Sequence, residues 1–285
     1  MKIDVNHLSK TYKNKKVLDD LSFTLTEPKI IGLLGRNGAG KTTFMEILAG
    51  HILASEGAIR INGANPFDNQ RLTESICLIQ ETNNFKAELK VKNVLQIYAY
   101  FYPTWDQALA DELIRKYQLD PDAKVKALSK GMASALGIIV GLASKAPITI
   151  FDEPYIGLDA AARKTFYDQL LDEYESEKRT IILSTHLIDE VSLMFEDVLI
   201  LQNGKLVLKE EAEQLRHRAY AVSGSAEDVE AFIQDKEIIH SEAFTGVMTA
   251  YVYGSMEQAK ATGLSVESIP IQKLMIYLTE EKEAQ

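Results

Sequence analysis

Residues 35–43 carry the side chains and glycines with the clearest chemical meaning in this chain, and they read Gly-Arg-Asn-Gly-Ala-Gly-Lys-Thr-Thr. They fit the phosphate-binding pattern G-x-x-x-x-G-K-[ST], whose glycines let successive backbone N–H groups close around phosphate oxygens. Lys41 is placed to reach the β- and γ-phosphates of a nucleotide, and Thr42 to ligate Mg²⁺. The predicted phosphate-binding residues are Asn37, Gly38, Ala39, Gly40, Lys41, Thr42 and Thr43.

The segments on either side of this loop fit the same function. Residues 30–34 form an apolar run typical of a buried strand, and residues 44–50 suit a helix that ends at a glycine. A helix that begins directly after the loop adds partial positive charge where phosphate would bind. This context favours a ligand-binding loop over a glycine turn without a ligand.

Two further strand ends carry polar side chains. The apolar run 148–151 ends in Asp152 and Glu153, and the run 180–183 is followed closely by His186. Ligands bind at the carboxyl edge of open α/β sheets, so we expect Asp152 to hold Mg²⁺ through water and Glu153 to polarise the attacking water. We expect His186 to contact the γ-phosphate and orient Glu153; the alternative is a structural or merely exposed histidine.

Composition limits the class of protein. The chain has 285 residues, 46% hydrophobic and 25% charged, which suits a soluble globular protein with one large domain and a small appendage. Its net charge of −10 disfavours nucleic acid or an anionic membrane surface as a direct partner. Cys77 is the single cysteine, which indicates a reducing compartment. The longest apolar stretch, 133–143, is too short to span a bilayer, so we expect any membrane role to depend on a partner.

The order of predicted elements indicates an α/β fold in two parts. Residues 1–212 alternate strands and helices around a helical segment at about 85–147, with strands at 198–201 and 205–208 and helices at 160–174 and 187–195. Residues 216–285 predict a small α+β unit of order β-α-β-β-α-β, ending in a helix at 271–278. That last helix is expected to close its own core, with a dimer contact or regulation as the alternative.

Residues 128–132, Leu-Ser-Lys-Gly-Met, add a diagnostic motif. They occupy the place of the Leu-Ser-Gly-Gly-Gln signature, so that residues 1 to about 212 resemble the ATP-binding-cassette (ABC) ATPases. The resemblance implies a P-loop nucleotide-binding domain with a RecA-like core and antiparallel β and helical subdomains. It also implies ATP and Mg²⁺ as cofactors and a head-to-tail dimer that sandwiches two ATP molecules.

The resemblance also assigns roles to individual residues. It implies Glu153, His186, Lys41 and Gln80 as catalytic residues and Thr42, Gln80 and Asp152 at the metal. It places Tyr12 on the adenine ring, matches residues 157–159 to the D-loop, and gives Ser129 and Gly131 to the ATP held by the other subunit.

Two signature positions depart from the family pattern, because Lys130 replaces a glycine and Met132 replaces the glutamine. A lysine there either strengthens the contact with a polyanion or obstructs the backbone approach, unless it simply points to solvent. The Leu-Ser-Lys-Gly-Met form resembles a bacterial branch whose members drive export of peptides, including antimicrobial and phenol-soluble-modulin peptides.

The resemblance predicts an ATPase subunit that works with a polytopic membrane subunit and with a second copy or a paralogous subunit. We expect it to be cytoplasmic and peripheral on the inner face of the cell membrane. The aromatic residues Tyr98, Tyr100, Phe101, Tyr102 and Trp105 either form the core of the helical segment, which their spacing slightly favours, or line a groove for the membrane subunit. A soluble ABC ATPase acting on ribosomes is the alternative function. The single cassette and the acidic charge disfavour it.

Overall fold

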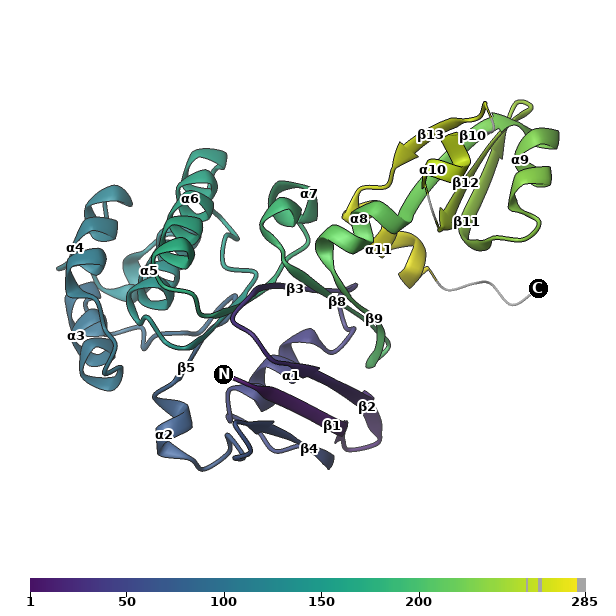
Figure 1. Cartoon of the computed structure of the whole chain (residues 1–285). Coiled ribbons are helices and arrows are strands. Elements are labelled where there is room, and N and C mark those ends of the chain that lie inside the picture. The colour runs from purple at the N-terminus through teal and green to yellow at the C-terminus, as the bar shows by residue number, and fades with distance from the viewer. Residues whose placement is uncertain (255, 261–262, 281–285) are drawn as a thin grey trace.

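A computed structural model describes residues 1–254, 256–260 and 263–280, and it contains three sheets (Figure 1). A six-stranded sheet has the order β5-β6-β7-β3-β8-β9, a three-stranded sheet the order β2-β1-β4, and a four-stranded sheet the order β11-β12-β10-β13. The strands of the first two sheets are β1 (Ile3–Tyr12), β2 (Lys15–Leu25), β3 (Ile30–Leu34), β4 (Glu56–Ile61), β5 (Ile76–Ile79), β6 (Ile148–Asp152), β7 (Thr180–Ser184), β8 (Asp197–Gln202) and β9 (Lys205–Glu211).

The six-stranded sheet is the centre of the molecule. Five of its strands are parallel and β9 is antiparallel at one edge. Every residue of β3, β6 and β7 is buried, as expected for short apolar strands covered on both faces. One core lies between this sheet, the three-stranded sheet and α1 (Lys41–Leu48), and a larger core packs the helices against the other face. The sheet therefore provides a rigid base whose carboxyl edge carries loops.

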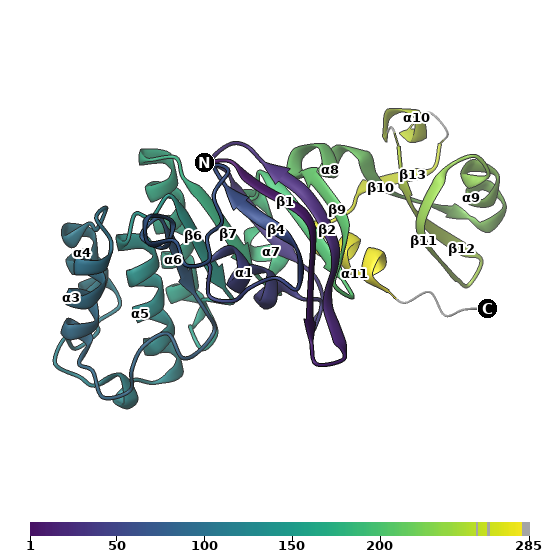
Figure 2. The ribbon, with the colours of Figure 1, turned by 90° about the horizontal axis from the view of Figure 1, so that it is seen from below.

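The helical segment forms a group at one end of the molecule, visible on the left of Figures 1 and 2. It contains α3 (Val91–Phe101), α4 (Gln107–Lys116) and α5 (Lys130–Ala143), and α6 (Ala160–Ser176) lies beside α5. Three of these helices begin at a residue whose side-chain oxygen accepts a hydrogen bond from a backbone N–H of the first turn. The capping residues are Asp106 for α4, Ser129 for α5 and Asp159 for α6. The cap at Ser129 fixes the start of α5 at Lys130, within the signature residues 128–132.

The C-terminal segment projects at the opposite end of the molecule (Figure 2). Its elements are β10 (Ala219–Ser225), α9 (Ala226–Ile233), β11 (Glu237–Phe244), β12 (Val247–Tyr253), α10 (Met256–Lys260), β13 (Ser265–Ser268) and α11 (Ile271–Thr279). The order β-α-β-β-α-β is as expected, and a separate small core lies beneath this antiparallel sheet. Helix α11 does not close that small core as expected, because its buried residues Ile271 and Leu274 belong to the large core of the first part.

The structure corrects several sequence-based element predictions. The helix expected at 187–195 is one short helix, α7 (Ile188–Val191), followed by a 3-10 turn, because Phe195 turns inward against Gly32. Two helices, α2 (Gln70–Thr73) and α8 (Ala212–Arg218), are present where none was predicted. A helix is also expected from the sequence at 256–262, and its last two residues lie outside the described part of the chain.

Two Asn-Gly turns allow a matched test of how the β8–β9 turn supports the phosphate-binding loop. Gly63 and Gly204 have similar left-handed backbones, with φ of 85° and 79°. A Cβ on Gly63 would meet nothing within 4 Å, whereas one on Gly204 would lie 2.4 Å from the Val17 carbonyl oxygen. The Gly204 N–H also donates to the carbonyl of Ala39 at 3.1 Å.

We expect Gly63→Ala to lower the free energy of unfolding by about 1–2 kcal/mol, which is the cost of left-handed backbone alone. Gly204→Ala should cost at least about 2 kcal/mol more, because backbone atoms must also move apart. Urea denaturation of both variants measures the difference. Equal losses would mean that the close approach at Gly204 is relieved without strain.

Candidate functional site: a phosphate-binding loop and the strand ends beside it

The loop between β3 and α1 has the backbone that phosphate binding needs. Gly35, Gly38 and Gly40 all have positive φ, at 147°, 84° and 103°. Helix α1 begins at Gly40 with no side-chain cap, so its first N–H groups remain available for an anion. The Lys41 ammonium donates to the carbonyl of Gly35 at 2.7 Å and holds the loop closed around itself.

Thr42, in the first turn of α1, and Asp152, at the end of β6, come together. The Thr42 hydroxyl donates to Asp152 Oδ2 at 2.7 Å, although 110 residues separate them in sequence. Asp152 pairs in register with Ser184, which pairs in turn with Leu33, so three strand ends share one edge. Burial lowers the pKa of Lys41, while the carboxylates of Glu153 and Asp152 act in the opposite direction. A buried cation thus lies among two acids at this edge.

Glu153 and His186 are in direct contact. His186 Nδ1 lies 2.7 Å from Glu153 Oε2, and the His186 ring remains 61% exposed while the Glu153 side chain is 13% exposed. Tyr155 reaches the same oxygen, since its hydroxyl donates to Glu153 Oε2 at 2.6 Å. The structure therefore brings together the two residues that the sequence predicted as a base and its partner.

A hollow of about 330 Å³ opens above the loop. It is lined by most of the predicted phosphate and metal residues, with Lys15, Val17 and Glu81 completing it; the predicted residues in the lining are Asn37, Gly38, Gly40, Lys41, Thr42, Thr43, Asp152 and Glu153. Ala39 is buried and lines a smaller hollow of about 280 Å³ on the other side of the loop. The site is open, polar and large enough to receive a phosphate chain.

The signature residues lie apart from this hollow. Ser129 caps α5, with its hydroxyl accepting from the Met132 N–H at 3.2 Å. Gly131 packs on Gly157 so closely that a Cβ would lie 2.4 Å from the Gly157 carbonyl oxygen. Lys130 extends to Glu81, 3.5 Å away, and does not simply point to solvent.

Comparisons with known proteins match this geometry. The family model described as ABC transporter matches residues 18–156. An uncharacterized ABC transporter ATP-binding protein of Methanocaldococcus jannaschii is 36% identical over 211 residues, which cover 72% of this chain and 76% of that protein. The chain belongs to the family of ABC transporter ATP-binding proteins.

Two other similarities extend the comparison. The bacitracin transport ATP-binding protein BcrA of Bacillus licheniformis is 32% identical over 219 residues, covering 76% of this chain and 72% of that protein. A solved ATP-binding subunit of an ABC transporter superposes with a TM-score of 0.68 at 27% identity, covering 76% of this chain and 92% of that chain. The chain is therefore an ABC ATPase, the ATP-binding subunit of a transporter, with the predicted α/β cassette fold.

Two predicted nucleotide-site residues of this ABC ATPase do not line its hollow. The Gln80 amide donates to Glu46 Oε1 of α1 at 3.1 Å, and Gln80 is not among the residues that line the hollow. Tyr12 ends β1 with its ring 42% exposed, and Lys10 Nζ lies 4.9 Å from the ring centroid. Their assigned contacts with Mg²⁺ and adenine remain predictions.

The residues present fit Mg²⁺ together with a nucleotide. Thr42 and Asp152 provide hard oxygen donors 2.7 Å apart, and Mg²⁺ in nucleotide sites takes few protein oxygens and completes its octahedron with phosphate and water. The described residues hold no cluster of three or more acidic, histidine or cysteine side chains suited to a metal. A site that needs the nucleotide's own oxygens agrees with both observations.

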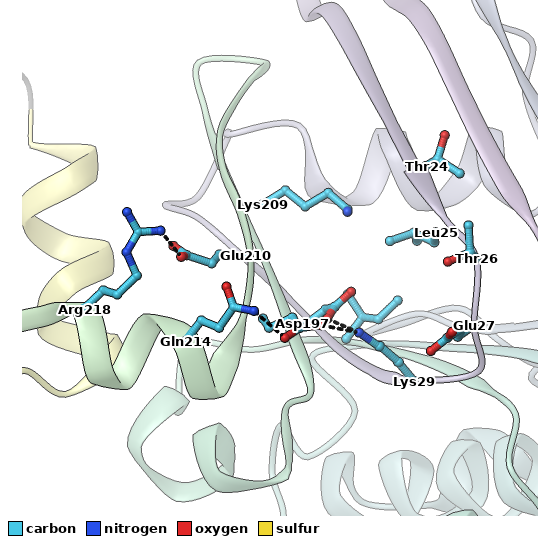
Figure 3. A pocket seen from close by; sticks show the side chains of 12 residues that line it. Thr24, Leu25, Thr26, Glu27, Lys29, Asp197, Lys209, Glu210, Gln214 and Arg218 are labelled. Carbon is cyan, nitrogen blue, oxygen red and sulfur yellow. Dashed lines mark hydrogen bonds and ion pairs between the residues drawn. The ribbon is translucent and has the colours of Figure 1, made fainter. Parts of the chain in front are cut away.

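A larger hollow, of about 640 Å³, lies at the opposite edge of the central sheet, between β2, β9 and α8 (Figure 3). Its charged groups are largely paired with one another. Lys29 lies 2.8 Å from Asp197 and 3.4 Å from Glu211, and Arg218 lies 3.0 Å from Glu210. Cations already neutralised by carboxylates are poorly placed for phosphate, so this hollow is not the nucleotide site.

Sequence reasoning missed Tyr155 and Thr185. Both are buried, and their hydroxyls meet beside Glu153. The available signal was position: Tyr155 is two residues after Glu153, and Thr185 directly precedes His186. The sequence indicates a chemical role for the ionisable residues Glu153 and His186, whereas a neighbouring hydroxyl group has no such signal of its own.

Proposed function

We propose that this ATPase subunit hydrolyses ATP with Glu153 as the general base and His186 as its partner. The observation that carries the proposal is the meeting of Lys41, Thr42, Asp152, Glu153 and His186 at one sheet edge. Thr42 and Asp152 would hold Mg²⁺, with Gln80 joining them, and this ion would neutralise phosphate charge. Lys41 would exchange its bonds to loop carbonyls for bonds to phosphate oxygens.

In the same proposal, two subunits are needed for a complete site. Ser129 and Gly131 do not line the hollow of their own chain, which supports a role toward ATP bound by a second subunit. Lys130 would bring its positive charge to the same interface, because it lies at the exposed start of α5. The second subunit is a copy of this chain or a paralogue.

We further propose that residues 1–212 form the ATPase domain and 216–285 an accessory domain. The separate small core under β10–β13 supports this division. Helix α8 spans the proposed boundary, and α11 returns to the main core. The last helix of the accessory segment thus attaches it to the ATPase domain.

A groove between α3 and the β5 side of the central sheet fits a short amphipathic helix of a membrane subunit. It has a volume of about 310 Å³ and is lined by apolar residues that include Leu78, Ile97 and Phe101. The aromatic residues of this segment differ in exposure. Tyr102 is buried and belongs to the core, whereas Phe101 and Tyr100 are 40% and 95% exposed and remain accessible to a partner. No helix in the described part of the chain combines the length and apolar character needed to cross a bilayer. The proposed location is therefore peripheral, on a membrane partner at the cytoplasmic face.

For the transported substrate we propose a peptide, moved outward. Two observations support this: the similarity to the bacitracin transport protein and the Leu-Ser-Lys-Gly-Met signature. In the complex of this subunit with its membrane partner, bacitracin-like cyclic peptides should stimulate ATP turnover. Stimulation by a lipid substrate with no response to peptides would contradict the proposal.

Co-isolation from membranes tests the proposed partner and its docking groove. Tagged Glu153→Gln protein, held in its ATP-bound state, should retain a polytopic membrane protein in stoichiometric amount. Adding Ile97→Glu, at a residue that is 50% exposed, should reduce that recovery about tenfold or more because a charge would enter the apolar contact. Val207→Glu, on the distant strand β9, is the matched control and should leave recovery unchanged. Recovery of ribosomes in place of a membrane protein would support the alternative function.

A further inference from the structure

Tyr155 is a buried tyrosine at the edge of the candidate active site. Its side chain is 1% exposed, and its hydroxyl lies within hydrogen-bond distance of Glu153 Oε2, Thr185 Oγ1 and the His186 N–H. These partners come from the ends of β6 and β7, which are adjacent strands. One hydroxyl therefore links the two segments that carry Glu153 and His186.

We propose that Tyr155 is a positioning residue that fixes the orientation of the Glu153 carboxylate for attack by water. The inference rests on the proposed role of Glu153 as general base, and it names the group that holds this base in place.

The protons in this network can be assigned without conflict. A tyrosine hydroxyl donates one hydrogen bond and accepts two. Tyr155 donates to the Glu153 carboxylate at 2.6 Å, because an ionised carboxylate can only accept. It accepts from the His186 N–H at 3.1 Å and from the Thr185 hydroxyl, which in turn accepts from the Leu187 N–H at 2.9 Å. The hydroxyl hydrogens of Tyr155 and Thr185 are therefore both used.

The assignment leaves one carboxylate oxygen of Glu153 for chemistry. Oε2 receives hydrogen bonds from both Tyr155 and His186, whereas nothing within the described ranges donates to Oε1. With Oε2 anchored at two points, rotation of the carboxylate is restricted, and Oε1 is the oxygen left to meet a water molecule in the hollow that Glu153 lines. Burial raises the pKa of Tyr155, so its hydroxyl remains a donor throughout the neutral range.

A purely structural role for Tyr155 would make a different prediction, because its ring also fills space in the large core. Tyr155→Phe keeps the ring and removes only the hydroxyl. We expect kcat to fall by about 10- to 100-fold, since small displacements of a catalytic group cost up to about 10²-fold, while KM for ATP changes less than about threefold. Equal changes in kcat and KM would overturn the inference.

Tyr174→Phe is the matched control. Tyr174 is also buried, and its hydroxyl also donates to a glutamate carboxylate, that of Glu196, at the far end of the sheet. Both variants lose a hydroxyl-to-carboxylate hydrogen bond, and Tyr155→Phe also removes the acceptor of the His186 N–H and of the Thr185 hydroxyl, so its thermal midpoint should fall by at least as much as that of the control. Only Tyr155→Phe should lose kcat; an equal loss in the control would show that the effect is one of stability.

A double-mutant cycle with Glu153→Gln separates this inference from the proposed function. If Tyr155 acts through Glu153, Tyr155→Phe should add less than about twofold to the loss already caused by Glu153→Gln. A further loss equal to that of the single variant would overturn the positioning role. Wild-type kcat in Tyr155→Phe with an inactive Glu153→Gln would overturn only this inference. Normal turnover in Glu153→Gln would overturn both the base assignment and the inference.

Discussion

Glu153→Gln is expected to bind ATP normally and to hydrolyse it about 10²–10⁴ times more slowly, which is the usual cost of losing general-base catalysis. The substitution keeps the size of the side chain and removes its charge. The groups expected to contact phosphate and Mg²⁺, Lys41, Thr42 and Asp152, all remain in place around the hollow. Bound ATP that is not hydrolysed should therefore hold two subunits together. Single-turnover hydrolysis and light scattering with ATP measure both effects.

Glu81→Gln provides the matched control for this result. Glu81 lines the same hollow and carries the same charge, but its carboxylate faces Lys130 rather than His186. Its loss should lower the rate less than about tenfold, as expected for an exposed ion pair. A Glu153→Gln variant with near-normal turnover would contradict the base assignment, and comparable losses in both variants would point to the charge of the hollow in general.

The second large effect is expected from Lys41→Ala, which should weaken ATP binding about 30- to 1,000-fold. The Lys41 ammonium lines the hollow and is buried there, and charge-assisted hydrogen bonds are worth about 1.5–3 kcal/mol each. A total loss of about 2–4 kcal/mol, within the worth of one to two such bonds, gives this range because each 1.4 kcal/mol is about a factor of ten. Titration with a fluorescent ATP analogue and Mg²⁺ measures the affinity directly.

The same substitution should leave the fold intact. Burial lowers the pKa of Lys41, which means that the folded protein disfavours the charged ammonium. Removing the ammonium therefore removes the desolvation cost of burying that charge. Lys15→Ala tests the specificity of the effect, because Lys15 is an exposed lysine that lines the same hollow. If both variants lost affinity equally, overall positive charge rather than the loop lysine would explain ATP binding.

Much of the central sheet could be predicted from sequence because its inner strands β3, β6 and β7 are short and fully buried. The range expected for β3, 30–34, matches the structure, since it is an apolar run bounded by polar residues and a turn. The phosphate-binding loop is also a local feature: Gly35 to Thr43 are contiguous, so their pattern shows in sequence without any tertiary contact. The parts that were predicted well are those whose cause lies within a few neighbouring residues.

The features that sequence did not predict depend on contacts between distant segments. The ion pair of Lys130 joins it to Glu81, 49 residues away, and nothing local specifies that contact. Helix α8 is polar and short, and it is stabilised by burial of Ala212 and Leu215 in the large core rather than by its own pattern. The role of Tyr155 could not be predicted for a related reason. The sequence shows only a tyrosine after a proline, and the carboxylate that its hydroxyl contacts is known only from the folded chain.

The backbone contact between Gly131 and Gly157 has a consequence for a dimeric ATPase. No side chain fits between the two segments, so the start of α5 and the segment that follows Glu153 must shift together. Ser134, which donates to the Ile156 carbonyl at 2.6 Å, ties them a second time. In the proposed dimer, α5 would begin beside the ATP held by the neighbouring subunit. The segment with Ile156 and Gly157, which contacts α5, follows β6 and Glu153 of the same chain. Each subunit would then sense the occupancy of its neighbour through main-chain atoms, and the two ATP sites would respond cooperatively rather than as independent catalysts.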